Sequence, residues 1–340
     1  MNRRLFARLL GMVSLLLAGC QSIDVISSRP LFGLDNRQEM IDAEMSACTV
    51  GSSVFAVLHS ASLQKVSADS WSVLEARTLS DAGWCASQRF ARQPAIAKCT
   101  AFLISSTRVA SAGHCINEPD YPAGPGLNCE DTLLVLDFKL GIDGQTPTAM
   151  RSDQVYRCNS VLAGKDSRIG PDWRVVELDR AVPRQPLPVY SGEQLPDAVE
   201  LQVVGHPHGL PMKAADQGQI ISYASGRYRT TLDTFRGNSG SPVYTLVEGS
   251  AVVIGLMSGG SSDKEKQTPG QACHEERICD ADNVCPGQLA THAQPLAQWA
   301  EHRLATLSDA KYLNTVDQCA WCNDPLRSKH WQCPVASTLE

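Results

Sequence analysis

The sequence has no block of charge of one sign, and it lacks the glycine-rich loops that bind phosphate. Lysine and arginine total 30 residues against 36 aspartates and glutamates, and the two signs are mixed along the chain. A nucleic-acid-binding protein needs a basic face, so we expect no nucleic-acid partner. The absence of a phosphate loop or dinucleotide motif argues against nucleotide-dependent enzymes. Proline and glycine supply only 19 and 25 of 340 residues, which excludes a fibrous or mainly disordered chain.

The apolar stretch near the start of the chain is too short to cross a membrane. Leu9–Leu17 follows Arg3, Arg4 and Arg8, whereas a spanning helix needs about 20 apolar residues. A charged start followed by a short apolar stretch is typical of a signal peptide. We therefore expect the chain to be exported.

The residues after this stretch predict a lipid anchor. Leu17-Ala18-Gly19-Cys20 resembles the bacterial lipobox, in which the signal peptide is cut before a cysteine that carries a diacylglyceryl group. The resemblance implies that residues 1–19 are a lipoprotein signal peptide and that Cys20 is the lipidation site. Gln21 follows in place of an Asp, which implies an anchor in the outer membrane of a bacterial cell envelope, facing the periplasm. The alternative is an ordinary secretory signal cut nearby.

Thirteen cysteines are many for a cytosolic enzyme and indicate an oxidising compartment. Lipidation of Cys20 would consume one and leave an even number for disulfides. By elimination alone we pair Cys48 with Cys85 and Cys129 with Cys158. The late cysteines can instead bind zinc, with candidate ligands Cys319, Cys322, His274 and His330, although an exported chain favours disulfides.

From about residue 99 the chain consists of short runs of Val, Leu and Ile between turn residues, which predicts an all-β fold. The expected strands are Cys99–Ile104, Arg108–Ala112, Thr132–Leu140, Val155–Leu162, Trp173–Leu178, Glu200–Gly205, Gln219–Ala224, Pro242–Leu246 and Ala251–Met257. A proline-rich stretch, Val182–Pro188, is expected to link two sub-barrels. Outside this region we expect a short helix around Arg37–Ser46 and a helix over Leu289–Leu307.

Three segments carry the residue types that nucleophilic catalysis requires. A strand of small residues ends at His114, Asp172 opens an apolar strand, and Ser239 lies among glycines in Gly237-Asn238-Ser239-Gly240. A serine hydroxyl needs a base within hydrogen-bond reach, and that base needs an acid to fix its tautomer. Glycines around the serine allow the N–H groups of Gly237 and Ser239 to form an oxyanion hole. The pattern predicts acyl transfer with His114, Asp172 and Ser239 as catalytic residues.

In this chain order the three segments resemble the chymotrypsin-fold, trypsin-like serine peptidases. The Gly-Asn-Ser-Gly-Ser-Pro form of the serine motif is similar to their bacterial glutamyl-endopeptidase-like branch. The resemblance covers roughly Cys99 to Ser261 and implies two packed, antiparallel, six-stranded β-barrels with the site between them. It also implies a disulfide between Cys99 and Cys115.

These features divide the chain into four parts. Residues 1–19 are the signal peptide and residues 20–84 an N-terminal tether or extension. Residues 85–265 form the peptidase domain, with barrel 1 at about 85–182 and barrel 2 at about 189–265. Residues 266–340 form a Cys-rich C-terminal extension.

Asp172 has competitors for the acidic position, namely Asp153, Asp166 and Asp179. The family usually has a small residue two positions after the acid, whereas Arg174 stands here. We prefer Asp172 because it alone opens an apolar strand of the right kind.

Substrate binding is assigned to two segments. Asp233 lies six residues before Ser239, where trypsin-like members place the carboxylate that pairs with a substrate Arg or Lys at P1, and Thr234 follows it. The alternative is that Asp233 only braces its loop. Ser258-Gly259-Gly260 offers backbone groups to an extended peptide. Met257 stands where glutamyl-specific members have a His, which argues against cleavage after Glu.

The sequence therefore predicts a lipid-anchored serine endopeptidase that forms an acyl-enzyme with a protein or peptide substrate, with a basic P1 preference. No metal or organic cofactor is expected, and His206 and His208 are interpreted as exposed or supporting side chains rather than ligands. The alternatives are a non-catalytic binding or scaffold lipoprotein on a protease-like fold, a serine esterase, and an adhesion protein that works through its C-terminal extension.

Overall fold

The computed structural model describes residues 30–312 except 75, 122–123, 196–198, 261–271 and 280–284. Cys20, the predicted signal peptide and the candidate zinc ligands Cys319, Cys322 and His330 lie outside these residues. The helical elements of the described part are α1 (Met45–Gly51) and seven short 3₁₀ turns at Ser60–Ser62, Gly113–Cys115, Cys129–Asp131, Ser152–Gln154, Pro207–Gly209, Gln294–Leu296 and Leu307–Tyr312. No helix in this part of the chain is long and apolar enough to span a membrane.

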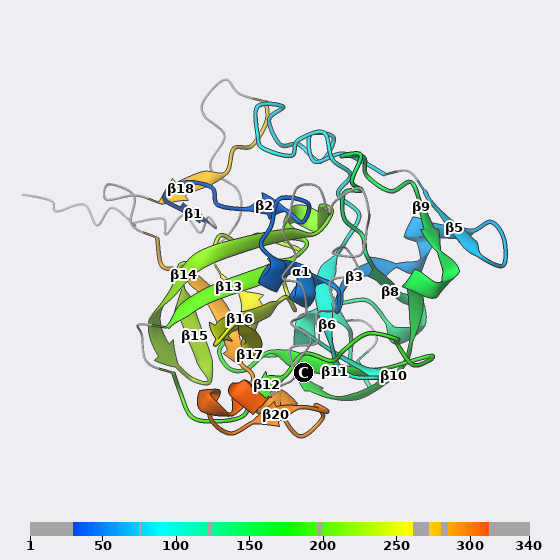
Figure 1. The fold of residues 1–340 in the computed structure, drawn as a ribbon. Coiled ribbons are helices and arrows are strands. Elements are labelled where there is room, and N and C mark those ends of the chain that lie inside the picture. Colours follow the sequence, from blue (N-terminus) through cyan, green and yellow to red (C-terminus); the bar gives the residue numbers. More distant parts are fainter. Residues whose placement is uncertain are drawn as a thin grey trace, which may run out of the picture.

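Six antiparallel strands close into barrel 1, which lies on the right in Figure 1. Around the barrel they are β10 (Val155–Lys165), β11 (Trp173–Leu178), β7 (Arg108–Ser111), β6 (Cys99–Ser105), β3 (Val54–His59) and β8 (Thr132–Leu136). Strands β3 and β8 are almost wholly buried because both of their faces are covered, one by the barrel interior and the other by surrounding segments. This is why they read as continuous apolar runs rather than as alternating patterns.

A second ring of six strands forms barrel 2, on the left in Figure 1. Its order is β16 (Pro242–Val247), β13 (Glu200–Gly205), β14 (Lys213–Ala224), β15 (Arg227–Thr230), β19 (Gln288–His292) and β17 (Ser250–Gly259), and pairing of β16 with β17 closes it. The expected all-β fold of two six-stranded antiparallel barrels is confirmed. Closure leaves no exposed edge within either ring.

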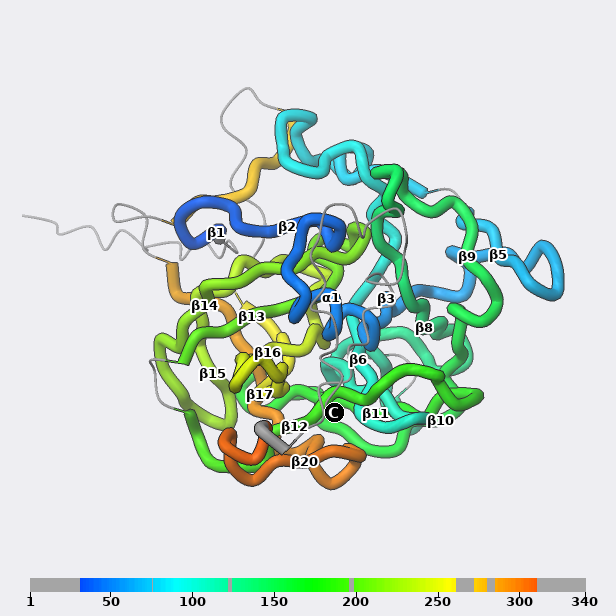
Figure 2. The backbone as a smooth tube through the Cα atoms, viewed as in Figure 1, coloured from blue at the N-terminus to red at the C-terminus, as the bar shows by residue number. Residues whose placement is uncertain are grey.

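The remaining strands are short and lie outside the rings. β4 (Leu63–Lys65), β5 (Ser70–Val73) and β9 (Ala149–Arg151) form a small sheet, and β12 (Val189–Tyr190) and β20 (Arg303–Leu304) add to β17. Residues 30–44, the N-terminal segment, are drawn in blue beside barrel 2 in Figure 2. In this segment β1 (Pro30–Phe32) pairs with β18 (Arg277–Cys279), and β2 (Gln38–Glu39) pairs with β14.

The two barrels include strands that lie outside the expected domain limits of residues 85 and 265. Strand β3 of barrel 1 precedes residue 85, and strand β19 of barrel 2 follows residue 265. The prediction of a helix over Leu289–Leu307 is wrong. Its first residues belong to strand β19, which pairs with β15 and β17 as the sixth strand of barrel 2. The helix expected around Arg37–Ser46 begins later, at Met45, because Gln38 and Glu39 pair with β14 instead.

Four disulfides are present among the described residues. Cys99–Cys115 and Cys129–Cys158 are bonded as expected. The pairing of Cys48 with Cys85 is wrong, because Cys85 is bonded to Cys273 across a separation of 188 residues. Cys279 is bonded to Cys285. Elimination failed because the partner of Cys85 is remote in sequence and only the folded chain brings it near.

Candidate active site

His114 and Asp172 lie together at one end of barrel 1, where β7 ends and β11 begins. His114 is in the turn Gly113–Cys115 after β7, and Asp172 directly precedes β11, which pairs with β7. The ring Nδ1 atom of His114 is 2.6 Å from Oδ2 of Asp172, and the backbone N–H of His114 donates to Oδ1 of the same carboxylate at 3.1 Å. An ionised carboxylate only accepts hydrogen bonds, so Nδ1 carries the proton and Nε2 is left as the basic nitrogen.

Burial differs between the two side chains in the way that general base catalysis requires. The His114 side chain is 35% exposed, whereas that of Asp172 is 3% exposed. The Asp172 N–H donates to the Thr291 hydroxyl at 3.0 Å, so β19 of barrel 2 also holds this residue. The competing residues Asp153, Asp166 and Asp179 are exposed. The structure brings Asp172, and none of these three, to His114.

Arg174 supports the backbone around His114. In the sequence it stood out only because the family usually has a small residue at this position. Its side chain is 2% exposed, and its guanidinium donates to the carbonyl oxygens of Gly113 at 3.2 Å and Ile116 at 3.0 Å. These two carbonyls flank His114. A third bond reaches Glu118 at 3.2 Å. Its signal in the sequence was a charged residue inside an apolar strand, where burial of a cation requires partners.

Strand β6 connects the histidine turn to the serine loop. Cys99 at its start is bonded to Cys115, the neighbour of His114. The next residue, Thr100, donates its N–H to the Ser239 carbonyl and its hydroxyl to the Gly237 carbonyl, both at 2.8 Å. Barrel 1 therefore holds the loop that precedes β16 of barrel 2. The segments that carry His114 and Ser239, although remote in sequence, are therefore both bonded to the start of β6.

The glycines around Ser239 are required by the backbone. Gly237 and Gly240 have φ of +98° and +86°, a region that L side chains rarely adopt. A Cβ on Gly240 would overlap the Thr100 carbonyl oxygen, and one on Gly237 would overlap that of His206. Ser239 itself is 6% exposed. Only glycine permits this loop to pack so closely against β6 and the 206–209 turn.

The predicted substrate-binding residues fall into two places. Asp233 and Thr234 are buried in the loop before Ser239. The Asp233 carboxylate accepts the N–H groups of Phe32 at 2.7 Å and Asn36 at 3.2 Å, so it faces the N-terminal segment. Burial raises the pKa of Asp233 to about 6, although these hydrogen bonds oppose the shift.

Ser258 and Gly259 end strand β17, and Gly260 follows it. The Ser258 hydroxyl donates to the Leu289 carbonyl at 3.4 Å, and Gly259 pairs with Leu289 in β19. Gly260 is exposed. Gly259 thus pairs within barrel 2, whereas Gly260 is exposed to solvent.

The His206 residue and the His208 side chain are buried, so of the two expected alternatives the exposed one is wrong and the supporting one stands. His206 Nδ1 is 3.0 Å from the Leu210 carbonyl, and burial lowers the pKa of its ring to about 3. His208 Nε2 is 3.0 Å from Glu276 Oε1. The His206 ring stacks on Phe138, and the His208 ring packs against Trp84 and Phe235.

One group of described residues has the spacing of a metal site, namely Cys99, His114 and Cys115. Because the two sulfurs are joined in a disulfide, neither is available as a thiolate ligand.

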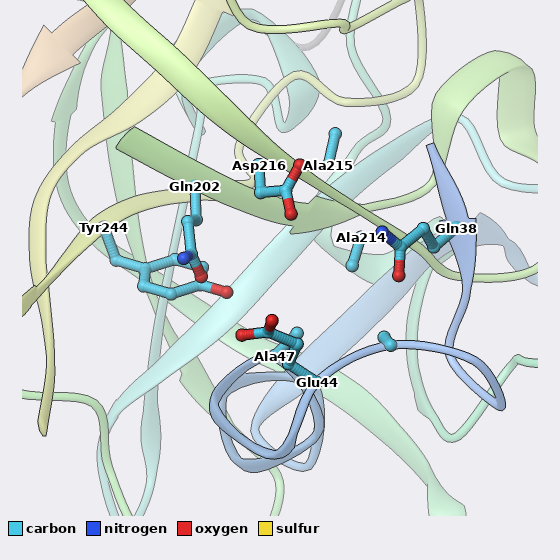
Figure 3. A pocket seen from close by; sticks show the side chains of 9 residues that line it. Gln38, Glu44, Ala47, Gln202, Ala214, Ala215, Asp216 and Tyr244 are labelled. Carbon is cyan, nitrogen blue, oxygen red and sulfur yellow. The ribbon is translucent and has the colours of Figure 1, made fainter. Parts of the chain in front are cut away.

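A separate polar pocket lies between α1 and barrel 2. Figure 3 shows Glu44 and Asp216 directing their carboxylates toward the space that the Tyr244 hydroxyl faces. None of the predicted site residues lines this pocket.

The chain was compared with curated proteins and with protein families. A search of curated proteins found no match to this chain. Residues 99–256 match the family model of the trypsin-like peptidase domain, a stretch that contains His114, Asp172 and Ser239. The two six-stranded barrels agree with this match to a trypsin-like peptidase domain.

Proposed function

We propose that this protein is a serine endopeptidase in which His114, Asp172 and Ser239 act as a catalytic triad. The observation that carries the proposal is the buried Asp172 carboxylate 2.6 Å from Nδ1 of a partly exposed His114. The hydrogen bonds of Thr100 to the Ser239 loop and the Cys99–Cys115 disulfide support it, because they join the segments that carry His114 and Ser239 to the start of β6.

The mechanism begins with attack of Ser239 Oγ on the substrate carbonyl carbon, while Nε2 of His114 takes the hydroxyl proton. Charge develops on the carbonyl oxygen and is stabilised by the N–H groups of Gly237 and Ser239. The intermediate collapses, the C–N bond breaks, and His114 returns the proton to the leaving amine. Water then attacks the acyl-enzyme ester by the same route, and Ser239 regains its proton.

Asp172 stabilises the imidazolium that forms in each half of the reaction. It also fixes the ring through two bonds, one to Nδ1 and one to the His114 backbone. Arg174 holds the carbonyls on both sides of His114. Catalysis of this kind depends on geometry set before the substrate arrives.

Substrate preference follows from where Asp233 directs its carboxylate. Two backbone N–H groups of the N-terminal segment already occupy it, which supports a bracing role over recognition of Arg or Lys at P1. Basic P1 preference remains a prediction. Comparing wild type with Asp233→Asn on peptides that differ only at P1 separates the two roles: a recognition residue loses activity on Lys and Arg alone, whereas a brace affects all substrates equally.

The proposed location is a bacterial cell envelope, with a diacylglyceryl anchor on Cys20. The support is the Leu17-Ala18-Gly19-Cys20 motif. Metabolic labelling with palmitate should mark the wild type and leave Cys20→Ala unlabelled. Equal labelling of both would contradict the anchor.

Peptidase activity itself is tested with a denatured protein substrate and the purified full chain. Mass spectrometry should find new internal termini with the wild type and none with Ser239→Ala. Parallel assays on matched peptide and ester substrates distinguish a peptidase from a serine esterase. Hydrolysis of the ester with no cleavage of any peptide would overturn the proposal in favour of an esterase.

A further inference from the structure

The oxyanion hole needs the backbone N–H of Gly237 to point at the carbonyl oxygen of the substrate. The direction of this N–H depends on the Arg236 carbonyl, which belongs to the same peptide group. The Arg236 carbonyl oxygen accepts the N–H of His208 at 2.5 Å. In a trans peptide the C=O and the following N–H point in opposite directions. The hydrogen bond to His208 therefore sets the direction of the Gly237 N–H. If the His208 backbone moved, this peptide plane would be free to turn.

His208 is held in an unusual position that its neighbours must maintain. Its φ is +55°, in the left-handed region that non-glycine residues rarely adopt. Its ring lies between Trp84 and Phe235, with both centroid distances 4.4 Å. Its Nε2 is 3.0 Å from Glu276 Oε1, and both side chains are nearly buried, at 3% and 4% exposed. Strain of this kind persists only where surrounding contacts impose it.

Glu276 connects His208 to the N-terminal segment. Its other oxygen lies 2.6 Å from a guanidinium nitrogen of Arg37, whose side chain is 1% exposed. Arg37 also stacks on Phe235 at 4.4 Å and forms an ion pair with Asp35. Glu276 is held in turn by the Gln88 side chain, which accepts its backbone N–H at 3.1 Å. A buried chain of contacts thus runs from Arg37 through Glu276 and His208 to the Arg236–Gly237 peptide.

We propose that Glu276 is a positioning residue of the oxyanion hole, acting through His208 to keep the Gly237 N–H directed at the substrate carbonyl. This rests on the proposed peptidase function. The N-terminal segment takes part because Arg37 is the cation that balances the buried Glu276 carboxylate. Glu276 touches no reacting atom, and its effect falls on stabilisation of the tetrahedral intermediate rather than on substrate binding.

The test compares Glu276→Leu with wild type and with Glu275→Leu, a change at the adjacent carboxylate, because the bonds to His208 and Arg37 are made by Glu276. Reaction with a fluorophosphonate is followed by intact mass to give both the rate and the final stoichiometry. We expect Glu276→Leu to react about ten- to a hundredfold more slowly, short of the 10²–10³ that loss of a whole oxyanion donor causes. Glu275→Leu should react at the wild-type rate.

The final stoichiometry separates positioning from stability. If Glu276 only stabilises the fold, a smaller fraction of the chains is labelled, and that fraction reacts at the wild-type rate. If it positions the hole, every chain is labelled, but slowly. With a cleavable peptide, kcat should fall while KM stays unchanged.

A second variant keeps the test informative if Glu276→Leu folds poorly. His208→Gly tolerates the positive φ and removes the ring that Glu276 holds. It should slow labelling to a similar degree, and the double variant should be no slower than either single one. Wild-type rates in folded Glu276→Leu and His208→Gly would overturn this inference. Absence of labelling in the wild type would instead count against the proposed function.

Discussion

At the scale of single residues, Asp172 has the sharpest expected effect. In Asp172→Asn the amide can donate to Nδ1, which favours the tautomer with its proton on Nε2, where the base is needed. The corresponding change in a well-studied serine protease lowers kcat by about 10⁴, and we expect a loss of that order here. Asp166→Asn is the matched control, since Asp166 is exposed and was a competitor in the sequence.

Steady-state hydrolysis of a peptide substrate checks this prediction. Asp166→Asn should keep wild-type activity, and both variants should keep the wild-type melting temperature within a few degrees. Full activity in Asp172→Asn would show that this carboxylate does not orient the base.

Asp233 gives a prediction about stability and pH. Burial raises its pKa in the folded chain to about 6 from the ordinary value of 3.8, so the folded state binds this proton more tightly than the unfolded state does. The associated stability is fully present below about pH 4 and is lost as pH rises toward 6. The loss is of the order of 3 kcal/mol, at about 1.4 kcal/mol for each unit of pKa.

Urea unfolding of wild type and Asp233→Asn from pH 3.5 to 7.5 measures this effect. The difference between the two unfolding free energies should change from about pH 4 through the folded pKa near 6 and level off above about pH 7, with the wild type losing stability relative to the variant. Other titrating groups cancel in the difference. Two parallel curves would be inconsistent with a raised Asp233 pKa.

At the scale of elements, strand β6 organises the candidate site because it is bonded to the segments that carry His114 and Ser239. Removing the Cys99–Cys115 disulfide by a Cys99→Ala, Cys115→Ala double change releases a loop with a sequence separation of 16. Loops of this size are worth about 3 kcal/mol in the chain-entropy description. We expect the free energy of unfolding to fall by about that amount.

Denaturant unfolding with the other disulfides intact measures this loss. Labelling by a fluorophosphonate should also slow, since the disulfide holds the residue next to His114. An unchanged unfolding free energy together with an unchanged labelling rate would mean that Thr100 and the barrel packing suffice.

The elements that sequence predicted well share a simple local signal. Strands β6, β7, β11 and β13 have dense apolar runs between turn residues, and the structure has them within a residue or two of the expected limits. Strand β19 lacked such a signal, because Gln288–His292 is short and partly polar. Its identity depends on pairing with β15 and β17, which sequence alone does not show.

The site was predictable where chemistry dictates residue type, and less so where packing does. His114, Asp172 and Ser239 were singled out because acyl transfer needs a base, an acid and a nucleophile, and the structure brings the first two into contact. Arg174, Thr291 and Glu276 were missed as supporting residues. Each acts through a contact between segments remote in sequence, and such contacts exist only in the folded chain.

At the scale of the whole molecule, the two-barrel fold extends beyond residues 99–256, which match the family model. Barrel 2 is closed by β19, whose Thr291 also accepts the Asp172 N–H. A chain ending at residue 265 should therefore fail to fold, because two strands of barrel 2 lose their partner and present open edges. A chain ending at residue 312 keeps every described strand and should remain folded.

Circular dichroism and gel filtration of the two truncated chains check this expectation. If the shorter chain were folded and active, β19 would be an addition to the barrel rather than a part of it. That outcome would also revive the interpretation of residues 266–340 as a separate extension.

The central claim is that Ser239 is an activated nucleophile, and reaction of the full chain with a fluorophosphonate tests it most directly. Intact-mass spectrometry of the disulfide-bonded protein should show one adduct on the wild type and none on Ser239→Ala. His114→Ala should react far more slowly than the wild type. If the folded wild type forms no adduct, the triad does not operate and the protein is a binding or scaffold protein on a protease-like fold.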